Sequence, residues 1–179
     1  TFVFVSKWMY EMFLRYTKID SSLLDDKKHI IYNSIGEQFE TNSYVHHKEK
    51  EYDFMTIRNN LDGSKYCIDV VTNIAITNPQ YKFCVVGKGE FFKHIEKPQN
   101  LIWIEKTLSH NEIINFLNRS KYALLPTRTD AQGVMACEIA TFGIPLITSK
   151  IDVCKEVFSD FKNVEYIDND STKMSLKPI

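Results

Sequence analysis

From residue 53 onward, short apolar runs alternate with longer stretches in which apolar side chains recur at helical spacing. Runs of four or five apolar residues bounded by turn residues are typical of buried strands, whereas a period of three to four residues is typical of amphipathic helices. The predicted strands are 54–57, 82–86, 101–104, 122–125, 145–148 and 164–167. The predicted helices are at about 65–77, 90–97, 110–119, 133–142 and 152–159.

Several helix ends carry local signals. Ser109 and Glu112 have the spacing of a capping box, Gly143 is a C-cap residue for the fourth helix, and Pro79 lies just past the first. Regular alternation of strands and helices predicts a doubly wound, Rossmann-like α/β fold with a parallel sheet of about six strands, because right-handed crossovers leave no other compact arrangement. Such sheets bind ligands beyond the carboxyl ends of their strands.

The first 45 residues have a different pattern. Residues 2–5 read as a strand, residues 7–17 as a helix and residues 29–32 as a second strand. The charged run 46–51 reads as a linker to the larger α/β region.

Composition excludes several classes of protein. The 22 Lys and Arg residues nearly balance the 23 Asp and Glu residues, which argues against a nucleic-acid partner bound through bulk charge. No apolar run reaches the roughly 18 residues that span a bilayer. The Cys and His residues lack the spacing of metal ligands, so we expect no metal site and buried, reduced thiols in a cytoplasmic protein. These thiols are Cys67, Cys84, Cys137 and Cys154.

The strongest candidate for chemistry is the segment 126–145, which holds two carboxylates around a predicted helix start. Gly133 opens this helix, so backbone N–H groups of the first turn are free for an anion. Glu138 lies among apolar residues, and burying a polar group without a partner costs about 2–7 kcal/mol. Hydroxyls of a sugar or ribose would suit Glu138 and Asp130; the alternative is that Glu138 pairs with a Lys or faces water.

Polar residues also follow the other predicted strands at the same rim of the sheet. Arg58 and Lys65 could clamp phosphates, Arg as a planar fork and Lys as a point charge, although each alone could be a solvated surface residue. Gly87 and Gly89 could line a ligand or simply form a turn. The segment 105–107 follows the third strand.

The run from Asp130 to Ser149 resembles the Glu-x7-Glu motif, with its trailing Gly-x-Pro-Val-Ile, of retaining GT-B glycosyltransferases of the glycosyltransferase 4 type. Asp130 stands in place of the first Glu. The resemblance implies that Glu138 binds the ribose of the donor nucleotide, that Asp130 lies against the donor hexose, and that backbone amides hold the diphosphate. Those amides belong to Gly133 and Val134, and Gln132 in the same loop is a further donor-binding residue.

The same resemblance assigns roles to the other rim residues. Arg58 and Lys65 match the Arg and Lys after the first strand of the donor domain, although the usual Lys-Gly is Lys65-Tyr66 here. With Asp130 they are the predicted catalytic residues, which stabilise the departing nucleoside diphosphate without a metal. The loop glycines match the Gly-x-Gly beside the nucleotide, and a further segment reads the base. These donor-binding residues are Gly87, Gly89, Glu105, Lys106 and Thr107.

The resemblance also implies a domain organisation. Residues 46–179 correspond to the nucleotide-sugar donor-binding domain, and residues 1–45 to a remnant of the N-terminal domain and linker. The run Ile31-Tyr-Asn-Ser-Ile35 stands where Ile-Pro-Asn-Gly-Val is usual. We expect the C-terminal helix of the family to be absent after Ile167 and this fragment alone to be inactive.

The implied function is transfer of a hexose from a nucleotide sugar to a glycan or lipid-linked acceptor, which the rest of the enzyme would bind, in bacterial surface polysaccharide synthesis. A UDP-sugar is favoured, with GDP- and ADP-sugars as alternatives. The implied location is the cytoplasm, with room for peripheral contact at the inner face of the membrane. Two other functions stay open: a GT-B epimerase or phosphorylase-like enzyme, and a non-catalytic sugar-nucleotide-binding module.

Overall fold

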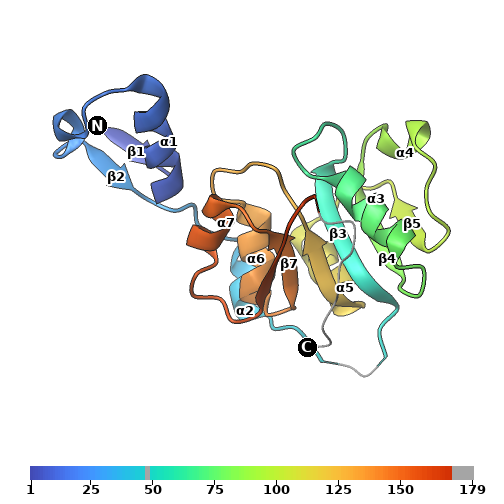
Figure 1. Ribbon diagram of the computed structural model, residues 1–179. Coiled ribbons are helices and arrows are strands. Elements are labelled where there is room, and N and C mark those ends of the chain that lie inside the picture. Colours follow the sequence, from blue (N-terminus) through green and yellow to red (C-terminus); the bar gives the residue numbers. More distant parts are fainter. Residues whose placement is uncertain (47–48, 171–179) are drawn as a thin grey trace.

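The computed structural model describes residues 1–46 and 49–170. Its larger part is a six-stranded parallel sheet with the strand order β5-β4-β3-β6-β7-β8 (Figure 1). The strands are β3 (Tyr52–Asn60), β4 (Phe83–Lys88), β5 (Leu101–Ile104), β6 (Ser120–Leu125), β7 (Leu146–Ser149) and β8 (Val164–Ile167). The predicted fold and all six predicted strands are therefore confirmed.

Helices cover both faces of this sheet. They are α3 (Ile68–Thr77), α4 (Phe91–His94), α5 (His110–Asn118), α6 (Val134–Phe142) and α7 (Asp152–Val157). Successive strand residues point to opposite faces, so Phe54 packs with α3 in one apolar cluster while Met55 packs with α5, α6 and α7 in the other. The two clusters hold the sheet between helical layers.

The helix ends differ from the prediction at two places. Helix α3 begins at Ile68, three residues later than expected, because Cys67 adopts a left-handed conformation with φ 52°. Helix α4 ends at His94, and the residue before Pro98 is disfavoured in the helical region, so the last expected turn is missing. The capping box at Ser109 is confirmed, as is Gly143 as the C-cap of α6.

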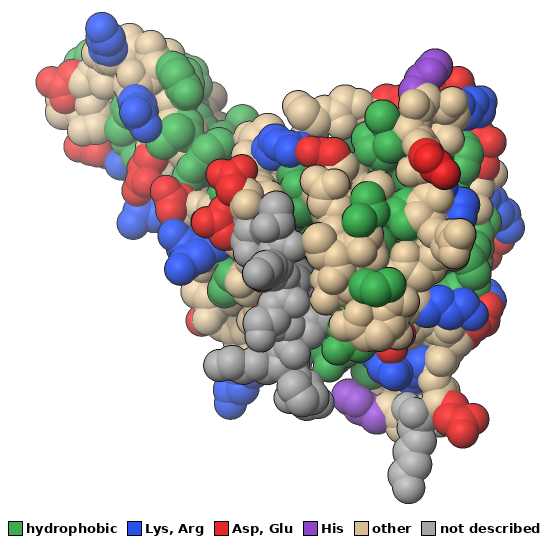
Figure 2. All heavy atoms as spheres, turned by 45° about the vertical axis from the view of Figure 1, so that its right-hand side comes forward, with side chains coloured by type: hydrophobic (Ala, Val, Ile, Leu, Met, Phe, Trp, Pro, Cys, Tyr) green, Lys and Arg blue, Asp and Glu red, His purple; other side chains and the backbone are tan. Residues whose placement is uncertain are grey.

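The N-terminal residues form a small separate unit, seen at the far left of Figure 1. It consists of β1 (Phe2–Phe4), α1 (Lys7–Thr17), the 3₁₀ turn η1 (Ser21–Leu24) and β2 (Lys28–Ile30), with β1 and β2 parallel. Phe4, Tyr10 and Leu24 form its core. Several of its apolar side chains are exposed, in keeping with the green areas on this unit in Figure 2, among them Phe2, Val3, Leu23 and Ile31. The expected strand-helix-strand is confirmed.

The carboxylate of Glu156 on α7 joins this unit to the larger sheet. It accepts hydrogen bonds from the backbone N–H groups of Lys7 at 2.7 Å and Trp8 at 2.6 Å, at the start of α1. The hydroxyl of Tyr32 donates to the same carboxylate at 2.6 Å. A negative charge at a helix N-terminus is favourable, so Glu156 stabilises this junction.

The connection to β3 contains a short helix, α2 (Glu37–Thr41), that the sequence pattern did not reveal. Its Phe39 is fully buried in the cluster beside α6, and the N–H of Tyr44 donates to the carbonyl of Phe142 at 2.8 Å. Residues 37–44 thus pack on the larger sheet. Part of the predicted linker, residues 47–48, and the terminal segment 171–179 lie outside the described residues. Across residues 1–46 and 49–170, every helix is too short or too polar to cross a bilayer.

Candidate functional site

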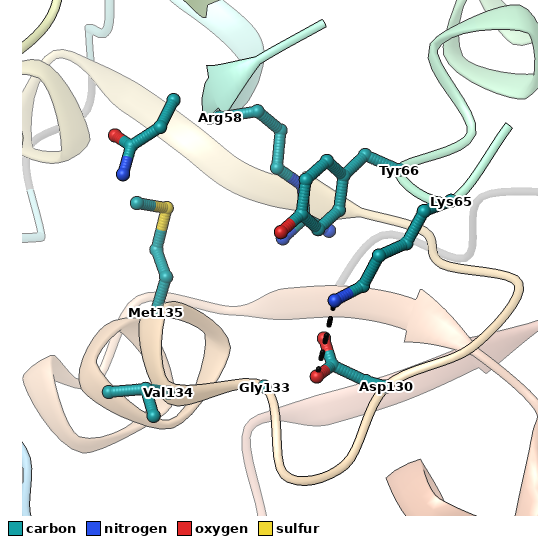
Figure 3. Close-up of a pocket in the computed structure, with 8 residues that line it drawn as sticks. Arg58, Lys65, Tyr66, Asp130, Gly133, Val134 and Met135 are labelled. Atoms are coloured by element: carbon teal, nitrogen blue, oxygen red, sulfur yellow. Dashed lines mark ion pairs between the residues drawn. The ribbon is translucent and has the colours of Figure 1, made fainter. Parts of the chain in front are cut away.

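The candidate site lies where the strand order reverses, between the adjacent central strands β3 and β6. The crossovers that leave these two strands run to opposite faces of the sheet, which opens a crevice at their carboxyl ends. Arg58 lies near the end of β3, and the loop from Pro126 to Gly133 follows β6. A pocket of about 190 Å³ lies between them (Figure 3).

Five residues singled out from the sequence line this pocket: Arg58, Lys65, Asp130, Gly133 and Val134. Three more line it that sequence reasoning missed as site residues: Asn59, Tyr66 and Met135. Each of these three directly follows a predicted site residue in the chain, so adjacency was the signal available. The fold therefore brings the predicted catalytic residues and the start of α6 into one cavity.

Arg58 is a buried cation at the base of the pocket, with only 6% of its surface exposed. Its Nη2 donates to the carbonyl of Pro126 at 3.0 Å, while its Nε has no hydrogen-bond partner among the described residues. Burial lowers the pKa of Arg58 to about 10, which still leaves it protonated at neutral pH. A buried positive charge with a free N–H group is well suited to receive an anion.

Lys65 and Asp130 form an ion pair across the mouth of the pocket. The Lys65 Nζ lies 3.7 Å from the Asp130 Oδ1, which also accepts the N–H of Ala131 at 2.8 Å. The Lys65 side chain is 44% exposed, so water weakens this pair to the range of about 0–1 kcal/mol. A phosphate group could therefore replace Asp130 as the partner of Lys65 at little cost.

Helix α6 directs its N-terminus into the same pocket. Gly133, the N-cap residue, has the left-handed angles φ 75° and ψ 57° and makes no side-chain capping bond. A residue with a side chain would be strained in this conformation. The first N–H groups of a helix have no partner within the helix, so those near Val134 and Met135 can bind an anion.

Glu138 is buried farther along α6 and does not line this pocket. Its Oε1 accepts the N–H of Gly36 at 3.1 Å and lies 3.9 Å from the Nε2 of His110. Among the described residues, its partners are therefore a backbone amide and a histidine, and neither a Lys nor bulk water. The second oxygen, Oε2, has no donor within the described part of the chain.

The Gln132 side chain is fully engaged elsewhere. Its Oε1 accepts the N–H of Asn33 at 2.6 Å, and its Nε2 donates to the carbonyl of the same residue at 3.1 Å. The amide thereby holds the backbone that leads from β2 to α2. Any contact of Gln132 with a donor would thus come from its backbone.

The two loop glycines permit a close approach between β4 and β3. A Cβ at Gly87 would lie 2.1 Å from the carbonyl oxygen of Arg58, and one at Gly89 would lie 2.9 Å from the Oδ1 of Asp62. The glycines therefore bring the backbone of β4 against the segment that carries Arg58. Whether they also contact a donor stays a prediction.

The segment after β5 lies on the same rim but outside the pocket. Glu105 pairs with Lys93 at 3.9 Å, and Lys106 forms an ion pair with Glu112. Strand β5 is the outer neighbour of β4, so Glu105, Lys106 and Thr107 mark the far end of the rim. Their role in reading a base stays a prediction.

The four thiols are free and buried, as expected. Burial raises the pKa of Cys84 to about 12 and that of Cys67 and Cys137 to about 11. Within the described ranges, no group of three His, Cys, Asp or Glu side chains is arranged to hold a metal ion.

Comparison with known proteins gives a consistent result. Residues 38–177 match the family model of glycosyl transferases group 1. An uncharacterized glycosyltransferase of Methanocaldococcus jannaschii is 24% identical over 145 residues, which cover 78% of this chain and 39% of the relative. The chain thus spans about two fifths of the length of this curated relative.

Solved structures with the same fold include two glycosyltransferases. WaaG, which is involved in lipopolysaccharide biosynthesis, superposes with a TM-score of 0.70 at 13% identity, over 95% of this chain and 50% of its own. TarM of S. aureus, in complex with UDP and alpha-GlcNAc-glycerol, gives 0.67 at 16% identity, over 95% of this chain and 34% of its own.

Proposed function

Because the chain belongs to the glycosyl transferases group 1 family, we propose that its larger unit is the donor-binding domain of a retaining glycosyltransferase that uses a nucleotide sugar. One observation carries this proposal: a buried Arg58, the ammonium of Lys65 and the open N-terminus of α6 meet in a single pocket at the switch point of the sheet. Three independent sources of positive charge around one cavity suit a diphosphate.

In the proposed reaction, the bond between the anomeric carbon of a hexose and the diphosphate oxygen breaks, and the electron pair stays on the nucleoside diphosphate. Arg58, Lys65 and the amides at Gly133 and Val134 would stabilise this negative charge as it develops. Groups that are already oriented before the reaction lower the barrier most, because they need no rearrangement in the transition state. Asp130, at the mouth of the pocket, is the residue proposed to face the hexose.

Glu138 is the proposed ligand of the ribose. Its Oε1 is held by the Gly36 amide and its Oε2 is free to accept a hydroxyl, so one oxygen orients the carboxylate and the other can bind. UDP is the proposed nucleotide, in line with the UDP bound by TarM, with GDP and ADP as alternatives.

The rest of the enzyme would supply the acceptor site. We propose a glycan or lipid-linked acceptor in bacterial surface polysaccharide synthesis, at the cytoplasmic side of the membrane, by analogy with the lipopolysaccharide role of WaaG. Since this chain spans about half the length of WaaG, transfer itself requires the whole protein.

The test is calorimetric titration of this chain with UDP, GDP and ADP. We expect one nucleotide to bind, and Glu138→Gln to weaken that binding at least tenfold through loss of a charge-assisted hydrogen bond of about 1.5–3 kcal/mol. Glu165→Gln, the same change at an exposed position on β8, is the matched control and should leave binding unchanged. A folded chain that binds none of the nucleotides, or a Glu138→Gln variant that binds normally, would refute the assignment.

A further inference from the structure

Tyr66 holds the two basic residues of the pocket together, at the position where the family resemblance would place a glycine. The Arg58 Cζ lies 4.6 Å from the centre of the Tyr66 ring, and the Lys65 Nζ lies 4.9 Å from the same centre. Both distances are within the range of a cation–π interaction. In Figure 3 the ring lies across the guanidinium of Arg58, between that group and the viewer.

The ring restricts the orientation of Arg58. One N–H edge of the guanidinium is already fixed by the carbonyl of Pro126, and the Tyr66 ring covers a face of the same planar group. A plane that is fixed along one edge and across one face has little freedom left to rotate. The N–H of Nε, which has no partner among residues 1–46 and 49–170, is thereby held in a set direction.

The ring also offsets the repulsion between two like charges. Arg58 and Lys65 approach one pocket from the end of β3 and from the turn before α3. The negative face of an aromatic ring attracts both, and Asp130 neutralises only part of their charge through a solvent-exposed pair. Without the ring, Lys65 would be free to turn toward water.

We propose that Tyr66 is a positioning residue that holds Arg58 and Lys65 ready for two adjacent phosphate groups, and so makes the pocket selective for diphosphates over monophosphates. The ligand class follows from the number of cations: one phosphate can engage one of the two, whereas a diphosphate engages both. This inference rests on the proposed function for the nucleotide part of the ligand, but the role of Tyr66 concerns the phosphates alone.

The test compares Tyr66→Leu, which loses the ring but keeps an apolar side chain, with Tyr66→Phe, which keeps the ring. Tyr16→Leu, at a highly exposed position on α1, is the matched control. Affinities for UDP, UMP and inorganic pyrophosphate are measured by calorimetry, with the melting temperature as a check on folding. We expect Tyr66→Leu to bind UDP and pyrophosphate about 3- to 30-fold more weakly, and UMP within twofold of the original chain. Tyr66→Phe and Tyr16→Leu should bind all three ligands as the original chain does.

A second measurement reports on the stacking itself without any ligand. The Nε–H resonance of Arg58, identified by its loss in Arg58→Lys, should be shifted upfield by the Tyr66 ring, keep that shift in Tyr66→Phe and lose it in Tyr66→Leu. An unchanged Arg58 resonance in Tyr66→Leu would overturn the proposal. So would equal losses of UDP and UMP affinity, or no loss of either.

The outcomes separate this inference from the proposed function. If the original chain binds pyrophosphate and does not distinguish UDP from it, the nucleotide assignment fails while the pyrophosphate series still decides the role of Tyr66. If it binds UDP and Tyr66→Leu binds UDP equally well, the role of Tyr66 fails alone. A folded chain that binds neither ligand overturns both.

Discussion

Replacing Arg58 by Met should stabilise the folded chain while removing its ability to bind an anion. Burial lowers the pKa of Arg58 from an ordinary value of about 12.5 to about 10. Each pKa unit corresponds to about 1.4 kcal/mol, so keeping this group charged in the folded state costs on the order of 3 kcal/mol. Met removes that cost and has a similar apolar length.

Two favourable contacts are lost at the same time. The hydrogen bond to the Pro126 carbonyl contributes about 1–1.5 kcal/mol, and the stacking with Tyr66 contributes about 0.5–1 kcal/mol. The difference leaves a net gain of about 1 kcal/mol in the free energy of unfolding. Since the folded pKa lies below the unfolded one, the cost is fully present at neutral pH and declines only as the pH rises through about 10.

The assay is urea unfolding followed by circular dichroism at pH 7 and pH 9, with Arg15→Met at an exposed position of α1 as the control. We expect a higher midpoint for Arg58→Met and an equal difference at both pH values, together with loss of UDP and pyrophosphate binding. A variant destabilised by more than 1 kcal/mol would refute the reasoning, because Arg58 would then be a net stabilising residue and its burial would need no ligand.

Three further predictions concern the frame around the pocket. Phe39→Ala should lower the free energy of unfolding by about 3–5 kcal/mol in urea titrations, because Phe39 is fully buried; a loss below 1 kcal/mol, as expected of the exposed control Phe2→Ala, would contradict the packing of α2. Gly87→Ala should lower the melting temperature far more than Gly63→Ala, since only the first would place a Cβ against the Arg58 carbonyl; equal effects would argue against the close approach. All four thiols should resist a thiol-specific reagent at pH 8 and react in urea, because burial raises their pKa values and hides them; a fast-reacting thiol in the folded chain would be inconsistent with this burial.

The sequence predicted the sheet and its rim because both depend on local patterns. Each strand is a short apolar run, and parallel strands place their carboxyl ends at one edge, so Arg58 and Asp130 could be brought together without coordinates. The helix α2 could not be found in this way. It has five residues and no side-chain cap, and what holds it is the burial of Phe39 in a distant core.

The partners of the buried polar groups were also beyond the sequence. Glu138 was expected to need a partner, and it has one in Gly36, 102 positions earlier in the chain. Gln132 was predicted to contact the donor, but its amide pairs with the backbone of Asn33, 99 positions away. Periodicity and motif spacing describe neighbours along the chain, and these contacts exist only after the chain has closed on itself.

The pairing of β3 with β6 determines when the pocket can form during folding. Arg58 reaches the Pro126 carbonyl across a seam between strands that are 68 positions apart, with β4 and β5 between them in the chain. Closing such a long loop costs entropy before any contact across it is gained, so this seam is a late event in folding. The residues up to Asn118 can build one half of the sheet, but they cannot build the pocket. Anion binding therefore begins only when the second half of the sheet has joined the first, and a bound ligand stabilises the seam that closes last.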